Sequence, residues 1–330
     1  MDAQVVARRR ALAGFAALAA TPLLCGCESW FAKPIAVAAH VWPGYEPMFL
    51  ARSEGWLDAR QVRLLETASA TASLRALLDG KVDGAALTLD ETLRARSTGT
   101  PLSVVMIFDV SAGADMLLVR PTIRALAELK GRRIGFEQGA LGELMLAHVL
   151  RAAGLTREDA QLVVLSVDRQ RQAWARDQVD AVITYEPVAS QLLAQGAHRL
   201  FDSSQIPNTI VDVLAMRSDV VDGDHAAAIS QLVAASFRAL AYLNRNPQGA
   251  SYRMAAHLGL APGEVLPAFK GLVLPDAGNN RRLLGGTSPA LLATAHSLVT
   301  LMLQAGLVKR DDAMAELIHA EFLPTDYPSS

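Results

Sequence analysis

The chain has 330 residues, of which 51% are hydrophobic and 19% charged, and its formal net charge at pH 7 is -2. This length allows one large domain or two medium-sized ones with sizeable cores, and the composition excludes a long disordered tail. Because no run of Lys and Arg recurs after the N-terminus, a nucleic-acid-binding surface is not expected.

The N-terminus has the pattern of an export signal. Arg8, Arg9 and Arg10 precede an uncharged run, rich in Ala and Leu, from Ala11 to Leu24. A membrane-spanning helix needs roughly 20 apolar residues, so this shorter run is typical of the hydrophobic part of a signal peptide. The three arginines also leave a twin-arginine export signal open. No later segment reads as a membrane span.

The run ends in Leu24-Cys25-Gly26-Cys27, which resembles a bacterial lipobox, although Cys25 stands where Ala or Ser is more usual. The resemblance implies a signal peptide over residues 1–26, a lipid on Cys27, a tether over 27–34 and a place on the periplasmic side of the cell envelope. The chain has no other cysteine, so the mature protein would have no disulfide. A Cys25–Cys27 disulfide or two inert thiols are the alternatives.

Strands and helices then alternate along the chain. The patterns predict strands over residues 35–41, 62–65, 84–87 and 102–108, and helices over 48–52 and 68–78. A second series follows, with strands over 133–136, 163–167 and 181–184 and helices over 138–153 and 169–176. Such alternation predicts α/β architecture with a mostly parallel sheet covered on both faces.

A short motif occurs twice. Lys81-Val82-Asp83-Gly84-Ala85-Ala86 and Gln178-Val179-Asp180-Ala181-Val182-Ile183 both read as a helix end, Val-Asp, a small residue and a buried strand. Each is followed by a polar loop and a predicted helix, which ends at Gly99 in the first copy and at Gly196 in the second. Two copies of one unit predict two similar lobes. After a strand over 213–216, the rest predicts helices over 226–244, 248–258, 262–271, 289–305 and 311–321, whose apolar faces must pack on the lobes.

Several motifs in order resemble a known family. They are Ile35 to Asp58 (IAVAAHVWPGYEPMFLARSEGWLD), Leu129 to Gly135, Val179-Asp180-Ala181 with Tyr185-Glu186-Pro187, and Asn246-Pro247 before a helix. The chain is similar over roughly Ile35 to Leu323 to the nitrate/sulfonate/taurine and thiamine-precursor solute-binding proteins, relatives of the eukaryotic thiamine-pyrimidine synthases. The resemblance implies a type II periplasmic-binding-protein fold whose two lobes close on a ligand.

The same resemblance implies the lobe boundaries and the partners. Crossing strands near residues 109–120 and 209–216 would divide a discontinuous lobe 1 (35–110 and 213–323, with the C-terminal helices) from lobe 2 (111–212). The expected function is the solute-binding component of an ABC importer. This component would be a monomer that hands a small molecule to a permease with its ATPase, without a cofactor or a metal. A ligand-binding domain that feeds a sensor is one alternative.

An enzyme of pyrimidine synthesis is the other alternative. Chemistry of that kind would need a nucleophile–base pair or a metal cluster. The mature chain has no cysteine beyond Cys27, and its histidines are scattered without a His-x-x-x-His pair. His40, at the end of a strand beside the expected cleft, is the histidine that stays a candidate. We therefore expect a protein that is not an enzyme.

In such a fold, ligands bind where strands end and helices begin. Three pairs of residues occupy such places, each with a plain structural alternative. Trp42 and Tyr45 follow the first strand and can stack on a ligand or fill the core. Ser69 and Thr71 start a helix and can contact a ligand or act as helix caps. Gln138 and Gly139 open a helix whose N–H groups suit an anion or a carbonyl, or form a turn.

Acidic residues near the expected hinge carry the ligand prediction. The candidates at strand ends and crossings are Asp90, Asp109, Ser111, Asp115, Tyr185, Glu186 and Asp212. Carboxylates at strand ends commonly cap or solvate. Asp109 and Asp212, however, would give the cleft a negative potential that favours an amine, an aminopyrimidine or a zwitterion such as taurine. No Lys or Arg stands at these positions, which disfavours nitrate and simple sulfonates.

Overall fold

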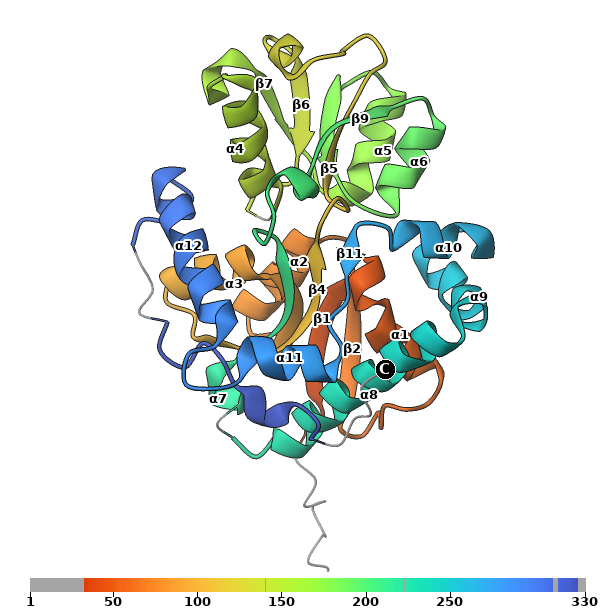
Figure 1. The fold of residues 1–330 in the computed structure, drawn as a ribbon, viewed down its shortest axis with the longest axis vertical. Coiled ribbons are helices and arrows are strands. Elements are labelled where there is room, and N and C mark those ends of the chain that lie inside the picture. The colour runs from red at the N-terminus through yellow and green to blue at the C-terminus, as the bar shows by residue number, and fades with distance from the viewer. Residues whose placement is uncertain (1–32, 140, 222, 311–313, 326–330) are drawn as a thin grey trace, which may run out of the picture. The chain divides into compact units, whose positions relative to one another are not determined.

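The computed structural model describes residues 33–330 except 140, 222, 311–313 and 326–330. The predicted signal peptide, Cys25 and Cys27 lie outside the described residues, so the expectations about them stay predictions. From Lys33 onward the chain holds two β-sheets with helices packed around them (Figure 1). We refer to the six-stranded sheet as sheet A and to the five-stranded sheet as sheet B.

Sheet A has the strand order β11-β4-β10-β3-β1-β2. Its strands are β1 (Ile35–His40), β2 (Val62–Thr67), β3 (Gly84–Thr88), β4 (Leu102–Ser111), β10 (Val211–Arg217) and β11 (Leu272–Val273). β1 pairs in parallel with β2 and β3, whereas β10 runs antiparallel between β3 and β4. The prediction of a mostly parallel sheet was therefore wrong for this half, because β10 brings the chain back from sheet B.

Sheet B has the order β7-β6-β8-β5-β9 and is mixed in the same way. Its strands are β5 (Met116–Val119), β6 (Arg133–Phe136), β7 (Gln161–Val164), β8 (Ala181–Thr184) and β9 (His198–Asp202). The chain enters through residues 112–115 and returns through 203–210. The sequence patterns missed β5, β9 and β11, and β7 ends earlier than predicted, since Val167 already begins a helix.

The predicted helices over residues 35–305 form with small shifts of their ends. They are α1 (Glu46–Ser53), α2 (Ala70–Leu78), α3 (Leu89–Ser97), α4 (Leu141–Ala153), α5 (Val167–Ala175), α6 (Val188–Ala194), α8 (Ala226–Arg245), α9 (Pro247–Leu258), α10 (Pro262–Ala268) and α12 (Ala290–Gln304). Two more, α7 (Ser218–Val221) and α11 (Ala277–Leu284), had no counterpart in the prediction.

The predicted helix over 311–321 is wrong for the part that the structure describes. Met314 and Glu316 have positive φ angles of 54° and 55°, which a right-handed helix does not allow. The following residues pair with β4 instead, since Ile318 forms a bridge with Val104. A single 3-10 turn, Ala320–Phe322, ends the segment.

One described helix, α8, is long and apolar enough to cross a membrane, with a mean hydropathy of 1.4 over its most apolar window. The sequence prediction that no later segment approaches a membrane span is too strong on that criterion. However, 56% of the window is buried inside the protein, and α8 packs against α1 and α9. A core helix explains both observations.

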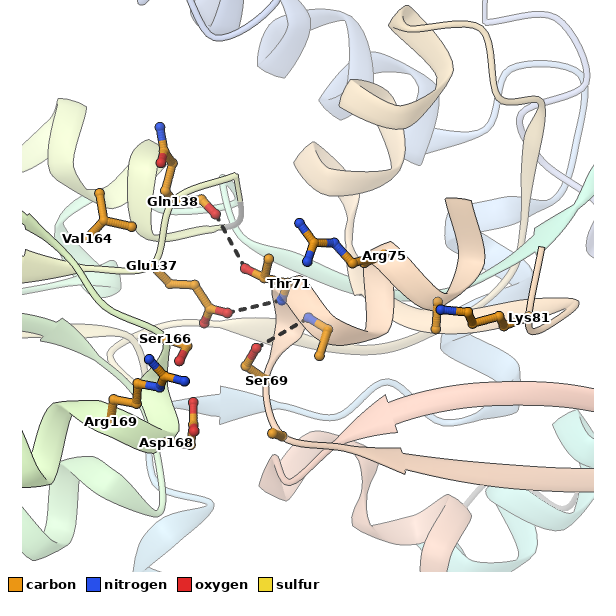
Figure 2. Close-up of a pocket in the computed structure, with 13 residues that line it drawn as sticks. Ser69, Thr71, Arg75, Lys81, Glu137, Gln138, Val164, Ser166, Asp168 and Arg169 are labelled. Atoms are coloured by element: carbon orange, nitrogen blue, oxygen red, sulfur yellow. Dashed lines mark hydrogen bonds between the residues drawn. The ribbon is translucent and has the colours of Figure 1, made fainter. Parts of the chain in front are cut away.

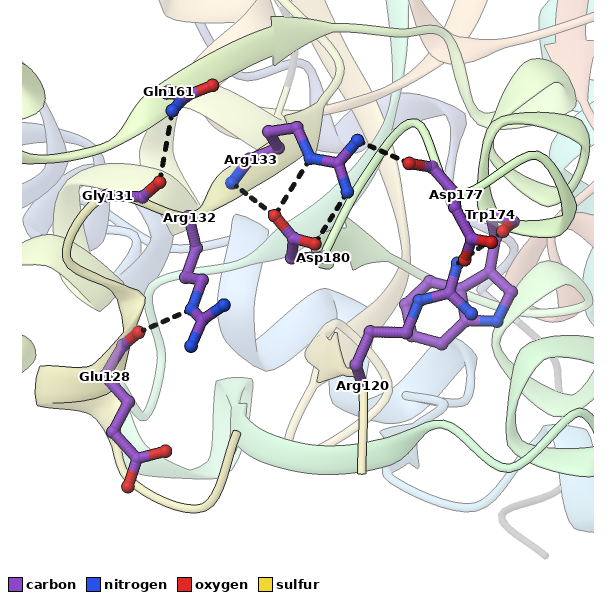
Figure 3. A network of polar contacts seen from close by, with 9 residues as sticks. All are labelled: Arg120, Glu128, Gly131, Arg132, Arg133, Gln161, Trp174, Asp177 and Asp180. Carbon is purple, nitrogen blue, oxygen red and sulfur yellow. Dashed lines mark hydrogen bonds and ion pairs between the residues drawn. The ribbon is translucent and has the colours of Figure 1, made fainter. Parts of the chain in front are cut away.

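The duplicated motif forms the same hydrogen bond in both sheets, from a backbone N–H to the Asp carboxylate. Asp83 accepts the Ala36 N–H of β1 at 2.7 Å, and Asp180 accepts the Arg133 N–H of β6 at 2.9 Å. In sheet B the Arg133 guanidinium adds two bonds to the Asp180 carboxylate, at 3.0 and 2.8 Å (Figure 3). Each Val-Asp motif thus fixes the loop before β3 or β8 to the start of the neighbouring strand.

The crossing into sheet B is held by a close backbone approach. Ala112 donates its N–H to Gly271 O at 2.7 Å, and the φ of Gly271 is +90°. A Cβ atom on Gly271 would lie 2.8 Å from Ala114 N and Gly113 C. The glycine therefore meets two requirements at once, a left-handed backbone and the absence of a side chain.

We expect Gly271→Ala to lower the free energy of unfolding by about 3 kcal/mol, because it adds overpacking to backbone strain. Urea unfolding measures the effect. The matched control is Gly259→Ala, since Gly259 has a φ of +63° with nothing within 4 Å of an added Cβ. The control introduces backbone strain without overpacking. Equal losses in the free energy of unfolding of the two variants would show that the close approach at Gly271 does not contribute to stability.

Candidate ligand-binding site

A small cavity lies where strands of both sheets end. His40 and Thr88 are the last residues of β1 and β3, and Glu137 and Tyr185 directly follow β6 and β8. The cavity is lined by His40, Trp42, Tyr45, Ala70, Thr88, Glu91, Asp115, Glu137, Leu141, Gly142, Tyr185 and Asp212. We call the parts of the protein built around sheet A and sheet B its two halves. The cavity has a volume of about 20 Å³, enough for a water molecule, so the side chains of the two halves have closed on one another.

Aromatic rings form one wall of the cavity. Tyr185 packs at 5.4 Å from the ring of Trp42 and at 5.5 Å from that of His40, and Tyr45 meets His40 edge-on at 5.3 Å. Tyr185 comes from the sheet B side and the other three from the sheet A side. The Tyr185 hydroxyl is buried close to the Ala70 backbone N–H. This wall can therefore stack on a flat ligand.

Two aspartates lie behind the rings, on the neighbouring strands β4 and β10 of sheet A. Asp109 of β4 and Asp212 of β10 are directly opposite each other in the antiparallel register. Asp109 accepts the Trp42 Nε1–H at 3.1 Å, and Asp212 accepts the hydroxyl hydrogen of Tyr45. Burial raises the pKa of Asp109 to about 8 and that of Asp212 well above its ordinary value, to which the Asp109 charge adds. Two buried carboxylates side by side cannot both ionise readily.

Three further carboxyl groups reach the cavity from other elements. They belong to Glu91 in the first turn of α3, to Asp115 just before β5, and to Glu137 after β6. Burial raises the pKa of Glu91 to about 8 and that of Asp115 to about 7. Each of these carboxyl groups keeps one buried oxygen without a partner. Buried acceptors of this kind are rare in proteins and indicate a missing donor.

No cation offsets this acidity among the described residues that line the cavity, which include neither Lys nor Arg. His40 does not supply a charge either, because burial lowers its pKa to about 3. The site is therefore a closed acidic cavity with an aromatic wall. It suits a ligand that brings positive charge or several N–H donors.

An open groove lies on the outer side of the same contact between the halves (Figure 2). It has a volume of about 480 Å³ and shares Glu137 with the inner cavity. Its other polar lining residues are Ser69, Thr71, Arg75, Lys81, Gln138, Ser166, Asp168 and Arg169. Thr71 donates its N–H to Glu137 Oε1 at 3.0 Å, so the start of α2 and Glu137 separate groove from cavity.

The predicted site residues divide into three groups in the structure. Five line the inner cavity: Trp42, Tyr45, Asp115, Tyr185 and Asp212. Three line the outer groove: Ser69, Thr71 and Gln138. Of these, Ser69 is also the N-cap of α2, since its hydroxyl accepts the Ala72 N–H at 3.3 Å. The remaining candidates are Asp90, Asp109, Ser111, Gly139 and Glu186, and they line neither space.

Contacts with neighbouring residues explain where several of these remaining candidates lie. Ser111 shares a hydrogen bond with Ser203 at 2.7 Å and fastens the two crossings together. Glu186 accepts the N–H and the hydroxyl hydrogen of Ser190 in α6. Asp90 is buried next to Glu91, and burial raises its pKa to about 6. Asp109 reaches the site through Trp42.

Glu91, Glu137 and Thr88 are cavity residues that sequence reasoning did not single out. Glu137 stands at the end of a predicted strand, the kind of position that selected Trp42 and Glu186, so the same signal could have found it. Glu91 is harder to recognise, because one of its oxygens accepts the Thr88 N–H at 2.9 Å. A Thr-x-x-Glu pattern before an apolar run reads as an ordinary helix start.

Comparison with known proteins adds independent information. A family model described as NMT1/THI5 like matches residues 42–250. The chain is 27% identical over 229 residues to an Escherichia coli (strain K12) protein named as binding aliphatic sulfonates, which covers 67% of this chain and 71% of that protein. These matches agree with the family resemblance found in the sequence motifs.

Solved structures show the same fold. The alkanesulfonate-binding protein SsuA from Xanthomonas axonopodis pv. citri, bound to MOPS, aligns with a TM-score of 0.72 at 22% identity over 88% of this chain and 100% of that one. The desulfurization enzyme DSZB aligns with a TM-score of 0.63 at 21% identity over 88% and 97%. The predicted type II periplasmic-binding-protein fold, with two α/β lobes, is confirmed. With its motifs, fold and matched residues in agreement, the chain belongs to the NMT1/THI5-like family.

Proposed function

We propose that this protein is the solute-binding component of an ABC importer, and that its solute carries a positive charge or several N–H donors. Amine-, aminopyrimidine- and taurine-like molecules fit this description. One observation carries the proposal: four carboxyl-bearing residues of both halves, Glu91, Asp115, Glu137 and Asp212, line a closed cavity whose described lining has no Lys or Arg. The binding role is supported by the relatives, which are named as binding proteins.

The charge of the cavity decides between solute classes. A buried carboxylate without a partner is costly, and an ammonium or amino group supplies the missing donors. A sulfonate or nitrate group placed there would bring a negative charge into a low-dielectric space whose described lining has no Lys or Arg to pair with it. The acidic cavity therefore disfavours simple alkanesulfonates for this chain, although relatives are named for them.

The size of the cavity implies movement. At about 20 Å³ it is too small for any of these solutes, so the halves must part to admit one. We propose that lobe 1 (35–110 and 213–323) and lobe 2 (111–212) open about the crossings and close around the solute. A permease would then recognise the closed form.

The expected location and partners follow from the same proposal. The relatives include proteins named as periplasmic binding proteins. We propose that this protein works as a monomer on the periplasmic side of the cell envelope, held to the membrane by a lipid on Cys27. It would deliver its solute to a permease with a cytoplasmic ATPase rather than to a sensor.

A purely binding role is also preferred over catalysis. The described residues contain no cysteine, since both cysteines of the chain precede Lys33. The cavity combines aromatic rings with buried carboxyl groups, which suits the binding of a solute that supplies hydrogen-bond donors. The likeness to a desulfurization enzyme concerns the fold, and a fold does not determine a function.

A thermal-shift screen with matched pairs of compounds tests the proposal. The pairs are 4-aminopyrimidine with pyrimidine, and taurine with ethanesulfonate, each differing in one amino group. Only compounds with the amino group are expected to raise the melting temperature, because binding to the folded form stabilises it by mass action. Stabilisation by ethanesulfonate or nitrate instead would overturn the proposed solute class.

Removal of the hinge aspartates is expected to weaken binding. Asp212→Ala takes away a carboxyl group of the cavity and leaves the buried Tyr45 hydroxyl without its acceptor. Hydrogen bonds to charged groups contribute about 1.5–3 kcal/mol, so the Kd for an amine that binds the wild type should rise about tenfold to hundredfold. Asp109→Ala should act in the same direction through Trp42. Isothermal titration measures both, and unchanged affinities would remove these residues from the site.

A further inference from the structure

Glu137 occupies a special place in this protein, because it alone among the described lining residues belongs to both the inner cavity and the outer groove. It follows the last residue of β6 in sheet B, and only 4% of its surface is exposed. A Cβ atom on Gly142 would lie 2.6 Å from Glu137 O and 2.8 Å from Glu137 N. The glycine thus lets the first turn of α4 pack closely on the Glu137 backbone and fix its position.

The two carboxyl oxygens of Glu137 have different surroundings. Oε1 accepts the Thr71 N–H at 3.0 Å (Figure 2). Thr71 lies in the first turn of α2, a helix that packs on β1 and β3 of sheet A. Oε2 is buried and has no partner. One oxygen therefore joins the two halves of the protein, and the other is available to a molecule in the cavity.

Other contacts between the halves lie outside the cavity. Arg94 of α3 forms an ion pair with Glu143 of α4 at 2.6 Å, and the Thr71 hydroxyl donates to Gln138 O at 3.3 Å. Neither Arg94 nor Glu143 lines the inner cavity. These contacts can favour closure whatever the cavity contains. Glu137 is different, because it combines a contact between the halves with a free acceptor in the cavity.

We propose that Glu137 couples recognition of the solute to closure of the protein, with Oε2 accepting an N–H of the solute while Oε1 holds the start of α2. This inference rests on the proposed function. The single carboxylate makes the two events interdependent, since a solute that fixes the Glu137 side chain also orients Oε1 toward Thr71. A solute without an N–H donor would leave Oε2 unsatisfied when the halves close.

Two substitutions separate the two roles. Glu137→Gln keeps an oxygen for the Thr71 N–H but presents an amide donor to the cavity, whereas Glu137→Ala removes both contacts. The probe is 4-aminopyrimidine, its Kd is measured by isothermal titration, and closure is measured by small-angle X-ray scattering at saturation. Arg94→Gln is the control, because it removes a contact between the halves away from the cavity.

Glu137→Gln is expected to raise the Kd by about tenfold to hundredfold and to close fully once saturated. Glu137→Ala should lose at least as much affinity and should also fail to reach the wild-type radius of gyration at saturation. Arg94→Gln should change the Kd of 4-aminopyrimidine and the Kd of any other solute that binds the wild type by the same factor. A Kd for Glu137→Gln equal to that of the wild type, or full closure of Glu137→Ala, would overturn the coupling. If 4-aminopyrimidine and the other amines fail to bind the wild type, the proposed function itself falls.

Discussion

Replacement of Gly44 by alanine is expected to abolish high-affinity binding, with a rise in Kd of at least about a hundredfold. An added Cβ would lie 1.8 Å from Asp109 Oδ2 and 2.7 Å from Trp42 Nε1, the two atoms that form the hydrogen bond behind the aromatic wall. Asp109 is fully buried and its short side chain cannot move aside without breaking that bond. The substitution should therefore displace Trp42 and the carboxyl group together.

The same variant should also be less stable. Overpacking of a well-packed interior costs about 1–3 kcal/mol, so the melting temperature should fall by about 2–10 °C. Gly263→Ala is the matched control, because Gly263 lies in the first turn of α10 with nothing within 4 Å of an added Cβ. The control should bind as the wild type does. Wild-type affinity in Gly44→Ala would mean that the Trp42–Asp109 contact does not shape the site.

Much of the fold could be predicted because local patterns and tertiary structure agree. The Val-Asp motifs mark β3 and β8 since Asp83 and Asp180 each close a loop onto a neighbouring strand. The strands β5 and β9 could not be found in the same way. They adjoin the crossings, and their pairing with β8 and with each other is a tertiary effect.

The candidate site was predictable to the extent that strand ends determine it. Trp42, Tyr45, Tyr185 and Asp212 follow or occupy ends of strands, and all four line the cavity. Glu186 occupies a similar position, but Ser190 in the next helix engages both of its oxygens. Which neighbour a strand-end carboxylate meets depends on side-chain direction, and the sequence pattern carries no such information.

A lower pH should weaken the binding of an amine and raise the free energy of unfolding of the unliganded protein. Burial raises the pKa of Asp90 to about 6, that of Asp115 to about 7 and those of Glu91 and Asp109 to about 8, from ordinary values of 3.8 and 4.5. Between about pH 4 and pH 8 the folded protein therefore holds protons that the unfolded chain has lost. The free energy of unfolding should fall as the pH rises through this range, by about 1.4 kcal/mol per pH unit for each such proton.

The unliganded protein favours the protonated form of these carboxyl groups, and binding of an amine should reverse that preference. A positive charge in the cavity favours the ionised form of the carboxyl groups around it, so the pKa values of Glu91, Asp115 and Asp109 should fall when the amine binds. The protons that they held are then released to the solvent. Because the unliganded protein holds fewer protons at higher pH, the affinity for the amine should increase from pH 6 to pH 8.

Isothermal titration in two buffers with different enthalpies of ionisation counts the released protons directly. At pH 6.5, a saturating amine whose own pKa is well above 8 should release about one proton per protein, and its Kd should fall about tenfold per pH unit. Asp109→Asn should release fewer protons, since it removes one of the groups whose pKa burial raises to about 8. A Kd independent of pH, with the same heat of binding in both buffers, would show that the carboxyl groups are already ionised in the empty protein. The positive charge of the solute would then meet a negative charge that is already present in the cavity. Closure of the empty protein would have to overcome the repulsion between the carboxylates of the two halves, which are Asp115 and Glu137 near sheet B and Glu91 and Asp212 near sheet A.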